Sequence, residues 1–322
     1  MMMSQHFLLS AAARSLSLAK VMRLNEDQAF DLFRSIRWTD GEAVCGKCGG
    51  CECYTFKARR IFKCKACGSQ FSVTSGTIFA SRKMDLRDIL AAIAIFVNGA
   101  KGHSALQLSR DLDCQYKTAF VLSHKIREAL AAEQAASLIE GEASVDGAHF
   151  GGYVKPANRR EDRVDRRRKA YRNGKRQVVI VAREHGVNGE TLTHVAKSEA
   201  DGVPFVMATV APGSIVHADE AGHWDALEAK YLTRRINHSV EYSTPEACTN
   251  MAESFFSRLR RAEVGIHHHI AGPYLAAYAM EMAWREDNRR ISNGEQFLLA
   301  TGAAMAHPVS RQWKGYWQRA AA

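Results

Sequence analysis

Three acidic residues have the type and the setting that binding of a divalent cation requires. Asp146 lies in the strand-like run Val-Asp-Gly-Ala-His-Phe-Gly-Gly, Asp219 ends the apolar run Ser-Ile-Val-His-Ala-Asp, and Glu253 lies near the start of an amphipathic helix. Proteins hold Mg²⁺ with one or two carboxylates together with substrate phosphates. Three such carboxylates in a basic chain therefore predict metal-assisted phosphodiester chemistry.

The helical periodicity around Glu253 separates an apolar side from a polar side. Glu253 lies at the margin of the apolar stripe, with an amide one turn before it and a guanidinium two turns after it. This position suits a carboxylate that faces a metal and a phosphate; a surface Glu in helix ion pairs is the alternative. The apolar side comprises Ala252, Phe255, Phe256 and Leu259, and the polar side comprises Asn250, Glu253, Ser257 and Arg260.

The two aspartates have different physical reasons for their positions. Asp219 lies at the end of an apolar strand, where ligand sites gather in α/β sheets, although it could also cap the next helix. Asp146 lies inside a β-branched and apolar strand. Its burial there is costly unless a cation or hydrogen bonds compensate. Of the three acids, Asp146 is therefore the one whose position is hardest to explain without a functional role.

A second group of residues predicts a zinc site. Two Cys-x2-Cys pairs separated by fifteen residues can place four thiolates around Zn²⁺, and strand-like runs between them are typical of a zinc ribbon. Four protein ligands leave no open position, so this zinc should be structural. Cys51 and Cys53 are extra, and exchange of one of them with Cys48 stays an alternative. The predicted ligands are Cys45, Cys48, Cys64 and Cys67.

The segment after the ribbon reads as a helix, a short turn at 113–115 and a second helix. The buried side of the first helix should consist of Leu106, Leu108 and Leu112. The second helix then resembles a recognition helix, although ordinary helix packing is the alternative. Its outward residues should be Gln115, Tyr116, Lys117, His124, Lys125 and Arg127, of which Lys117, Lys125 and Arg127 are candidate DNA contacts.

The stretch 155–176 concentrates the positive charge of the chain. It contains eleven Lys or Arg residues against three acids, a net charge of +8 in a chain whose net charge is +10. The pattern favours an arm that contacts DNA phosphates over a merely solvated loop. The candidate contacts in it are Arg166, Arg167, Arg168 and Lys169.

Composition limits the class of protein. A chain of 322 residues with 46% hydrophobic content can form a large core or several domains. Its positive charge favours a polyanionic partner, and no apolar stretch approaches the roughly 20 residues of a membrane span. Cysteines clustered between 45 and 67 favour a reducing, cytoplasmic compartment. Residues 1–24 suit either a short amphipathic helix or a targeting peptide.

The order and the motifs together resemble those of bacterial insertion-sequence transposases of the ISXO-like group. VDGAHFGG and HADEAGHW are similar to the segments that carry the first and second aspartates of that family. TNMAESFFSRLRRAEVGIHHH is similar to its third-acid helix and the histidines after it, and the closing helix from Tyr274 is also similar. The resemblance covers roughly residues 20 to 295.

This resemblance implies an α/β protein in which a ribonuclease-H-like domain follows a zinc ribbon and a helix-turn-helix-like segment. Strand-like runs, including 205–210, followed by helices after residue 143 agree with an α/β domain. The expected parts are an N-terminal helical segment (1–40), the zinc ribbon (41–80), a helical DNA-binding segment (82–138), the DDE transposase domain (140–295) and a C-terminal tail (296–322).

The resemblance also implies a function and a catalytic site. Asp146, Asp219 and Glu253 would hold two Mg²⁺ or Mn²⁺ ions, and Asn250 matches an Asn that precedes the third acid in the family. Arg260 stands where the family usually has Lys, which alters the geometry of a phosphate contact. The implied protein is a DNA transposase that binds insertion-sequence ends and catalyses cleavage and strand transfer. It would act on double-stranded DNA as a homodimer or larger assembly, in the cytoplasm near the nucleoid.

Three other functions remain open at this point. One is a catalytically silent DNA-binding regulator of the same descent, and another is a ribonuclease-H-like nuclease that cuts without strand transfer. A zinc-ribbon protein that binds RNA fits the charge but leaves the second half of the chain without a role.

Overall fold

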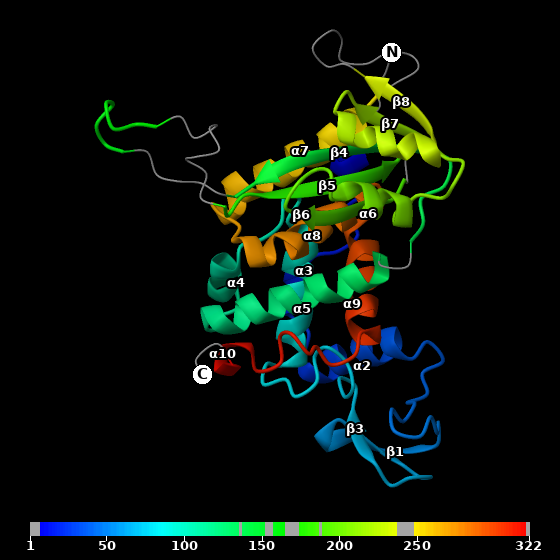
Figure 1. Ribbon diagram of the computed structural model, residues 1–322. Helices are drawn as coiled ribbons and strands as arrows, with labels where there is room; N and C mark the ends of the chain where they lie inside the picture. Colours follow the sequence, from blue (N-terminus) through cyan, green and yellow to red (C-terminus); the bar gives the residue numbers. More distant parts are fainter. Residues whose placement is uncertain are drawn as a thin grey trace, which may run out of the picture. The chain divides into compact units, whose positions relative to one another are not determined.

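The computed structural model describes residues 7–134, 137–151, 157–164, 174–186, 189–236 and 248–319 (Figure 1). Contacts divide the chain into two compact units. Unit 1 comprises Met1–Ala135 and Asn288–Ala322, and unit 2 comprises Ala136–Asp287. Along the chain, unit 2 is therefore inserted between the two segments of unit 1.

Unit 1 combines a small sheet with helices from both of its segments. The antiparallel sheet has the order β1-β2-β3, and α9 contacts α2, α3 and α5. The elements are η1 (Phe7–Leu9), α1 (Leu18–Met22), α2 (Glu26–Arg37), β1 (Cys53–Phe56), η2 (Lys57–Arg59), β2 (Ile61–Cys64), β3 (Gln70–Ser72), α3 (Leu86–Asn98), α4 (Ala105–Asp111), α5 (Tyr116–Gln134), α9 (Asn293–Ala306) and α10 (Tyr316–Arg319). The expected tail 296–322 thus contains most of α9 and all of α10, and the expected domain boundaries stay a prediction.

The helix α2 begins at a capping box and packs on the small sheet. Asn25 and Gln28 exchange side chain–backbone hydrogen bonds of 2.9 Å in both directions, which satisfies two backbone N–H groups at the helix start. Phe30 lies 5.8 Å from the ring of Phe62 on β2, and Trp38 meets the same ring edge-on at 5.4 Å. The helix and the small sheet therefore share one aromatic core.

Helices α4 and α5 form the expected pair around a turn, but two predictions about their faces are wrong. Leu106 is 51% exposed, and only Leu108 of the three predicted core leucines is buried. His124 and Arg127 were expected to face outward, and each is 1% exposed. Helix α5 is covered on several sides because α3, α4 and α9 all pack on it. Its ring of buried positions is therefore wider than a single amphipathic stripe.

Unit 2 is built around a mixed five-stranded sheet with the order β6-β5-β4-β7-β8. The central strand β4 pairs antiparallel with β5 and parallel with β7, β5 pairs antiparallel with β6, and β8 is parallel to β7. The strands are β4 (Glu142–Phe150), β5 (Gln177–Glu184), β6 (Thr191–Ala196), β7 (Ile215–Asp219) and β8 (Leu232–Ile236). The helical elements are α6 (Gly202–Thr209), η4 (Gly222–Ala229), α7 (Asn250–Ala262), η5 (Glu263–His267), η6 (Gly272–Tyr274) and α8 (Leu275–Asp287).

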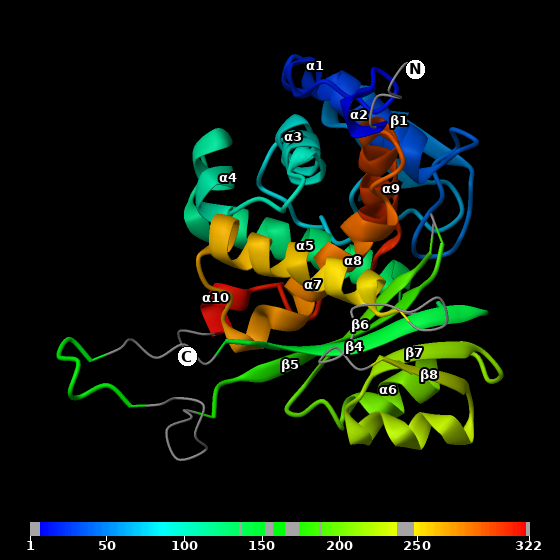
Figure 2. The same cartoon turned by 90° about the horizontal axis from the view of Figure 1, so that it is seen from above.

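Helical elements cover both faces of this sheet (Figure 2). Because side chains alternate along a strand, β4 contributes to two cores. Ala143 and Val145 pack with α6 and η4, whereas Ala148 and Phe150 pack with α7 and α8. The side chain of Asp146 belongs by this alternation to the face that α7 covers.

The run 205–210 was expected to be a strand and is instead most of α6. Its β-branched and apolar composition suggested a strand, but Gly202 and Val206 are buried four residues apart, which is the spacing of a helix, and only Val210 at its end is extended. Pro204 lies in the first helical turn, where its missing N–H costs no hydrogen bond. Among the described residues, none of the helices combines the length and apolarity that a membrane span requires.

Candidate functional site

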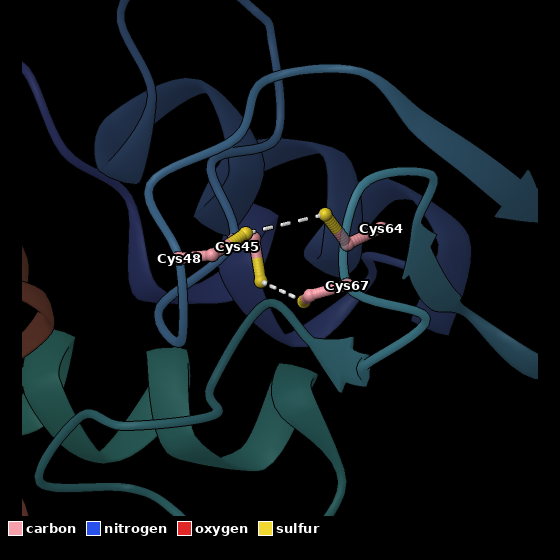
Figure 3. A group of neighbouring side chains, drawn as sticks. All are labelled: Cys45, Cys48, Cys64 and Cys67. Atoms are coloured by element: carbon pink, nitrogen blue, oxygen red, sulfur yellow. Dashed lines mark hydrogen bonds between the residues drawn. The ribbon is translucent and has the colours of Figure 1, made fainter.

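Four thiols come together in unit 1 (Figure 3). The Sγ atoms of Cys45 and Cys67 lie 3.6 Å apart, and those of Cys48 and Cys64 lie 3.5 Å apart. A zinc ion about 2.3 Å from each of four tetrahedral sulfurs separates the sulfurs by about 3.8 Å. The spacing of the thiols therefore fits one Zn²⁺ with four protein ligands.

The two halves of this cluster have the same local geometry. Gly49 N–H donates to the carbonyl of Cys45 at 2.8 Å, and Gly68 N–H donates to the carbonyl of Cys64 at 3.0 Å. Both glycines have positive φ, 75° and 70°, a conformation that glycine adopts without strain. The backbone N–H of Cys67 is the main cause that lowers the pKa of Cys64 to about 7. The lowered pKa favours the thiolate, which is the form that binds zinc.

The two additional cysteines lie outside the cluster. The thiol of Cys53 donates to the carbonyl of Ala43 at 3.4 Å, and Cys51 is exposed. Only the four predicted cysteines satisfy the geometry of a shared metal within this part of the described chain. Exchange of Cys48 with either extra cysteine is therefore not supported, and the cluster supports a structural zinc ion.

In unit 2, the strand register brings Asp146 beside Asp219. Ser144 of β4 pairs with His217 of the parallel strand β7. Two residues further along both strands lie Asp146 and Asp219. Neighbouring strands are about 4.8 Å apart, and residues two apart share one face. Both carboxylates therefore belong to the face of the sheet that α7 covers.

Helix α7 runs along the same face in the direction of β4. It begins at Asn250, with Glu253 in its first turn and the predicted apolar side buried against the sheet. Near its end the guanidinium of Arg260 lies 5.6 Å from the ring centroid of Phe150. Phe150 is four residues beyond Asp146, or roughly 13 Å along the strand. Asn250 and Glu253 thus begin the helix at the carboxylate end, and Arg260 lies well away from the two aspartates.

The electrostatics of the site is seen at Asp146, on which both other acids act. Burial is the main cause that raises the pKa of Asp146 to about 7. The charges of Asp219, Glu199 and Glu253 raise it further, while the 2.7 Å hydrogen bond from Gly147 N–H lowers it. Like charges this close disfavour the ionised form of a carboxyl group. A cation at this site would relieve the repulsion.

The chain just before α7 is clamped to the two central strands. The hydroxyl of Ser144 donates to the carbonyl of Cys248 at 3.0 Å, and the backbone N–H of Cys248 donates to Nδ1 of His217 at 3.1 Å. Ser144 and His217 are register partners. Both backbone groups of Cys248 are therefore held by one strand pair, five residues before Glu253. We call Ser144, His217 and Cys248 the helix clamp.

Glu142 and His185 surround the helix clamp. Nε2 of His217 lies 2.6 Å from Glu142, and Nε2 of His185 lies 2.7 Å from the hydroxyl of Ser144. The hydrogen bond from His217 lowers the pKa of Glu142, and burial lowers the pKa of His185. Together with His217, these two residues form a group close enough to share a metal ion.

The hydrogen bonds nevertheless do not fit a metal on Nε2 of His217. Nδ1 of this ring accepts the N–H of Cys248, so Nε2 must carry the proton of the neutral ring and donate it to Glu142. A metal-bound imidazole normally donates from its other nitrogen. The arrangement is that of a fixed hydrogen-bond network. No local pattern in the sequence could have indicated it, because Glu142, His185 and His217 meet only through strand pairing.

Glu199 is a further acid that the sequence interpretation missed. A Cβ atom on Gly147 would lie 2.7 Å from Cγ of Glu199, so the glycine leaves room for this side chain. One carboxylate oxygen of Glu199 lies 3.5 Å from Nε2 of His149. Its charge also contributes to the raised pKa of Asp146. No spacing in the sequence links residue 199 to the strand at 146.

The expected DNA contacts have different positions. Lys117 is exposed, and Lys125 is half-buried. Arg127 is buried, with its guanidinium 5.7 Å from the ring centroid of Phe96, so the outward position expected of it is wrong. The remaining candidates, Arg166, Arg167, Arg168 and Lys169, lie outside the described residues.

Comparison with known families identifies two domains in the chain. Residues 138–287 match the model of the ISXO2-like transposase domain, and residues 24–70 match that of the transposase zinc-ribbon domain. Together the two matches cover more than half of the 322 residues. No curated protein matches the chain. The chain belongs to the ISXO2-like transposases, and it joins a zinc ribbon to a ribonuclease-H-like DDE domain with a mixed five-stranded sheet.

Proposed function

We propose that this chain binds the ends of an insertion sequence and catalyses metal-dependent DNA cleavage and strand transfer. The observation that supports this proposal is electrostatic, because the charges of Asp219 and Glu253 both act on Asp146. Strand pairing brings the two aspartates together, and the charge of Glu253 acts on Asp146 from the first turn of α7. These three residues form the proposed DDE site.

The chemistry of the three residues fits two Mg²⁺ or Mn²⁺ ions. Hard divalent cations prefer carboxylate oxygens, and the mutual repulsion at Asp146 is a cost that bound cations remove. When bound, such ions polarise the scissile phosphate and lower the pKa of the attacking water or hydroxyl. The helix clamp then has a role, because it fixes the start of α7 and with it Glu253.

The proposed reaction has two balanced phosphoryl transfers. In the first, the oxygen of water attacks a phosphorus at the transposon end, and the bond to the 3′ oxygen breaks to leave a 3′-hydroxyl. In the second, that hydroxyl attacks a phosphodiester of the target. The new P–O bond forms as the bond to the target's 3′ oxygen breaks, and that oxygen takes up the proton which the attacking hydroxyl loses. Each step exchanges one phosphoester bond or hydrolyses one, so no energy-supplying cofactor is required.

The proposal assigns supporting roles to other residues. Asn250, which is exposed at the start of α7, would contact the DNA or the bound ions. Arg260 would contact a phosphate of the DNA outside the reacting centre, because it lies over Phe150. Lys117, Lys125 and the basic stretch at 166–169 would contact the phosphate backbone of the DNA. Joining two ends favours a homodimer or larger assembly on DNA, within the bacterial cytoplasm near the nucleoid.

The test uses the purified full-length chain, Mg²⁺ and duplex DNA that carries the terminal sequences flanking its gene. Asp146→Ala, Asp219→Ala and Glu253→Ala should each reduce cleavage by about 10³-fold or more, since each removes several kcal/mol of charge stabilisation. The matched control is Glu228→Ala, which removes an exposed carboxylate on η4 and should cleave like the wild type. Cleavage at the wild-type rate by all three variants would refute the assignment.

The same assay separates two of the alternatives, the silent regulator and the nuclease without strand transfer. A wild-type chain that binds these ends without cutting them would be a silent regulator. Cutting without joining of the freed 3′ end to a second DNA would indicate a nuclease.

A further inference from the structure

Unit 1 contains a groove of about 900 Å³ that the family resemblance does not explain. Three segments form its walls: the loop 79–84, the N-terminal half of α5 and the segment 313–318. The last segment leads into α10, which Figure 1 shows near the C-terminal end of the described chain. The volume lies in the range of about 300–1,000 Å³ that is usual for ligand pockets.

The charged residues that line the groove all have the same sign. They are Arg82, Lys83, Lys117, Lys125 and Lys314, and among the residues that the structure describes no carboxylate lines the groove. Arg82 forms an ion pair with Glu26 at 3.5 Å. For Lys83, Lys125 and Lys314, no ion pair exists within the part of the chain that the structure describes. The groove is therefore a concentration of uncompensated positive charge, which attracts anions.

Lys125 is the least solvated of these cations. Burial is the main cause that lowers its pKa, and the charge of Glu128 one turn away opposes the shift only in part. An ammonium group that loses water without gaining an ion pair is costly to keep charged. A phosphate in the groove would supply the missing partner.

Aromatic rings line the same groove, and their positions are fixed by packing. Trp313 is buried and stacks on His124 with 4.3 Å between ring centroids. Trp317 donates its indole N–H to the carbonyl of Lys117 at 3.4 Å, and the ammonium of Lys117 lies 5.3 Å from its ring centroid. Tyr316 and Trp317 remain partly exposed. These two rings are available for stacking beside the lysines.

We propose that this groove binds single-stranded DNA, with its lysines on the phosphates and Tyr316 and Trp317 against the bases. Lysines along a groove with interleaved aromatic rings are the usual combination for unpaired strands. Bases in a duplex already stack on one another, so the rings favour a single strand over a duplex. This inference rests on the proposed function only for the choice of DNA as the polyanion.

The test measures binding of a fluorescent oligo(dT) strand to the full-length chain without added divalent cation. It uses the Asp146→Asn background, so that cleavage plays no part. Lys314→Glu and Lys83→Glu should each weaken binding by about tenfold or more, and each should reduce the slope of log affinity against log salt by about 0.7. The matched control is Arg311→Glu, an exposed residue three positions before Lys314 that does not line the groove, and its affinity should change by less than about twofold.

A second variant tests the rings. Trp317→Leu should weaken oligo(dT) binding at least about fivefold and leave duplex affinity nearly unchanged. Equal losses for Arg311→Glu and Lys314→Glu would overturn the proposal, as would an equal loss of duplex binding in Trp317→Leu. Cleavage of end DNA is measured separately. If a chain that cleaves end DNA does not bind oligo(dT), the proposal about the groove is refuted and the proposed function is not.

Discussion

The zinc cluster and the carboxylate site assemble their ligands in opposite ways. The four cysteines occur within 23 residues of sequence, in two knuckles whose backbone hydrogen bonds are nearly the same. The carboxylates come from β4, β7 and α7, and Asp146 and Glu253 are 107 positions apart. One site is thus determined by local geometry, whereas the other exists only when the whole of unit 2 is folded.

This difference has an energetic counterpart. Zinc-binding thiolates contribute free energy to folding once the metal is present. The carboxylates have the opposite effect in the absence of metal, since Asp146 is held near its neighbours with a pKa raised to about 7, first by burial and then by Asp219, Glu199 and Glu253. Unit 1 should therefore depend on its metal for stability. Unit 2, in the absence of metal, should be destabilised by its own carboxylates.

The largest expected effect is on the zinc cluster. Cys64→Ser removes a ligand, and structural zinc contributes on the order of 10 kcal/mol in small zinc domains. We expect the variant to lose its zinc, measured by metal analysis, and to lose amide-exchange protection in β1 to β3. Cys51→Ser is the control, because Cys51 is exposed and lies outside the cluster. Full zinc content in the Cys64 variant would contradict the four-ligand site.

The second expected effect is a gain of stability in unit 2. A raised folded-state pKa means that the folded protein binds the proton of Asp146 more tightly than the unfolded chain does. Stability is therefore lost as the pH rises from about 4 through 7, and the loss is complete above 7. Asp146→Asn should stabilise the metal-free protein at pH 8 by up to about 4 kcal/mol and much less at pH 5.

Thermal unfolding at the two pH values, followed by amide exchange in β4, measures this gain. Added Mg²⁺ should narrow the difference at pH 8, because it stabilises the wild type alone. If the variant and the wild type unfold together at pH 8, the repulsion in the carboxylate site is not as described.

The smallest expected effect concerns the helix clamp. His217→Ala removes the acceptor for the N–H of Cys248, and we expect cleavage to lose about 10- to 100-fold in kcat with little change in KM. His217→Asn retains an amide oxygen close to the position of Nδ1 and should recover most of that loss. Zinc content should be the same in both variants. If kcat fell by the same factor in both variants and KM changed equally in both, the cause would be a general folding defect and not the loss of a positioning role.

The sequence predicts best those features that depend on neighbouring residues. The spacing of Cys45 to Cys67 determines a local site, and its four sulfurs do come together. The periodicity around Glu253 identifies the buried side of α7, because Ala252, Phe255 and Leu259 are all buried. In both cases the relevant partner lies within a few residues or on the same helix.

Features that depend on distant packing could not be predicted. Arg127 is buried because other helices enclose α5, and nothing in its own helix shows that. Residues 205–209 form a helix despite a strand-like composition, since the packing of Val206 overrides propensity. Glu142, His185 and His217 meet only because the register of three strands aligns them.

The insertion of unit 2 between the two segments of unit 1 also has a consequence for synthesis. Helices α2, α3 and α5 leave the ribosome before unit 2, but α9, which packs on all three, begins only at Asn293. At about 5–20 residues per second, the intervening roughly 150 residues take about 8–30 s to translate. Throughout that interval the apolar surface awaiting α9 is uncovered, and unit 2 has its whole sequence before α9 begins. The first helices made are therefore among the last to be enclosed, and chaperone binding during translation should concentrate on them.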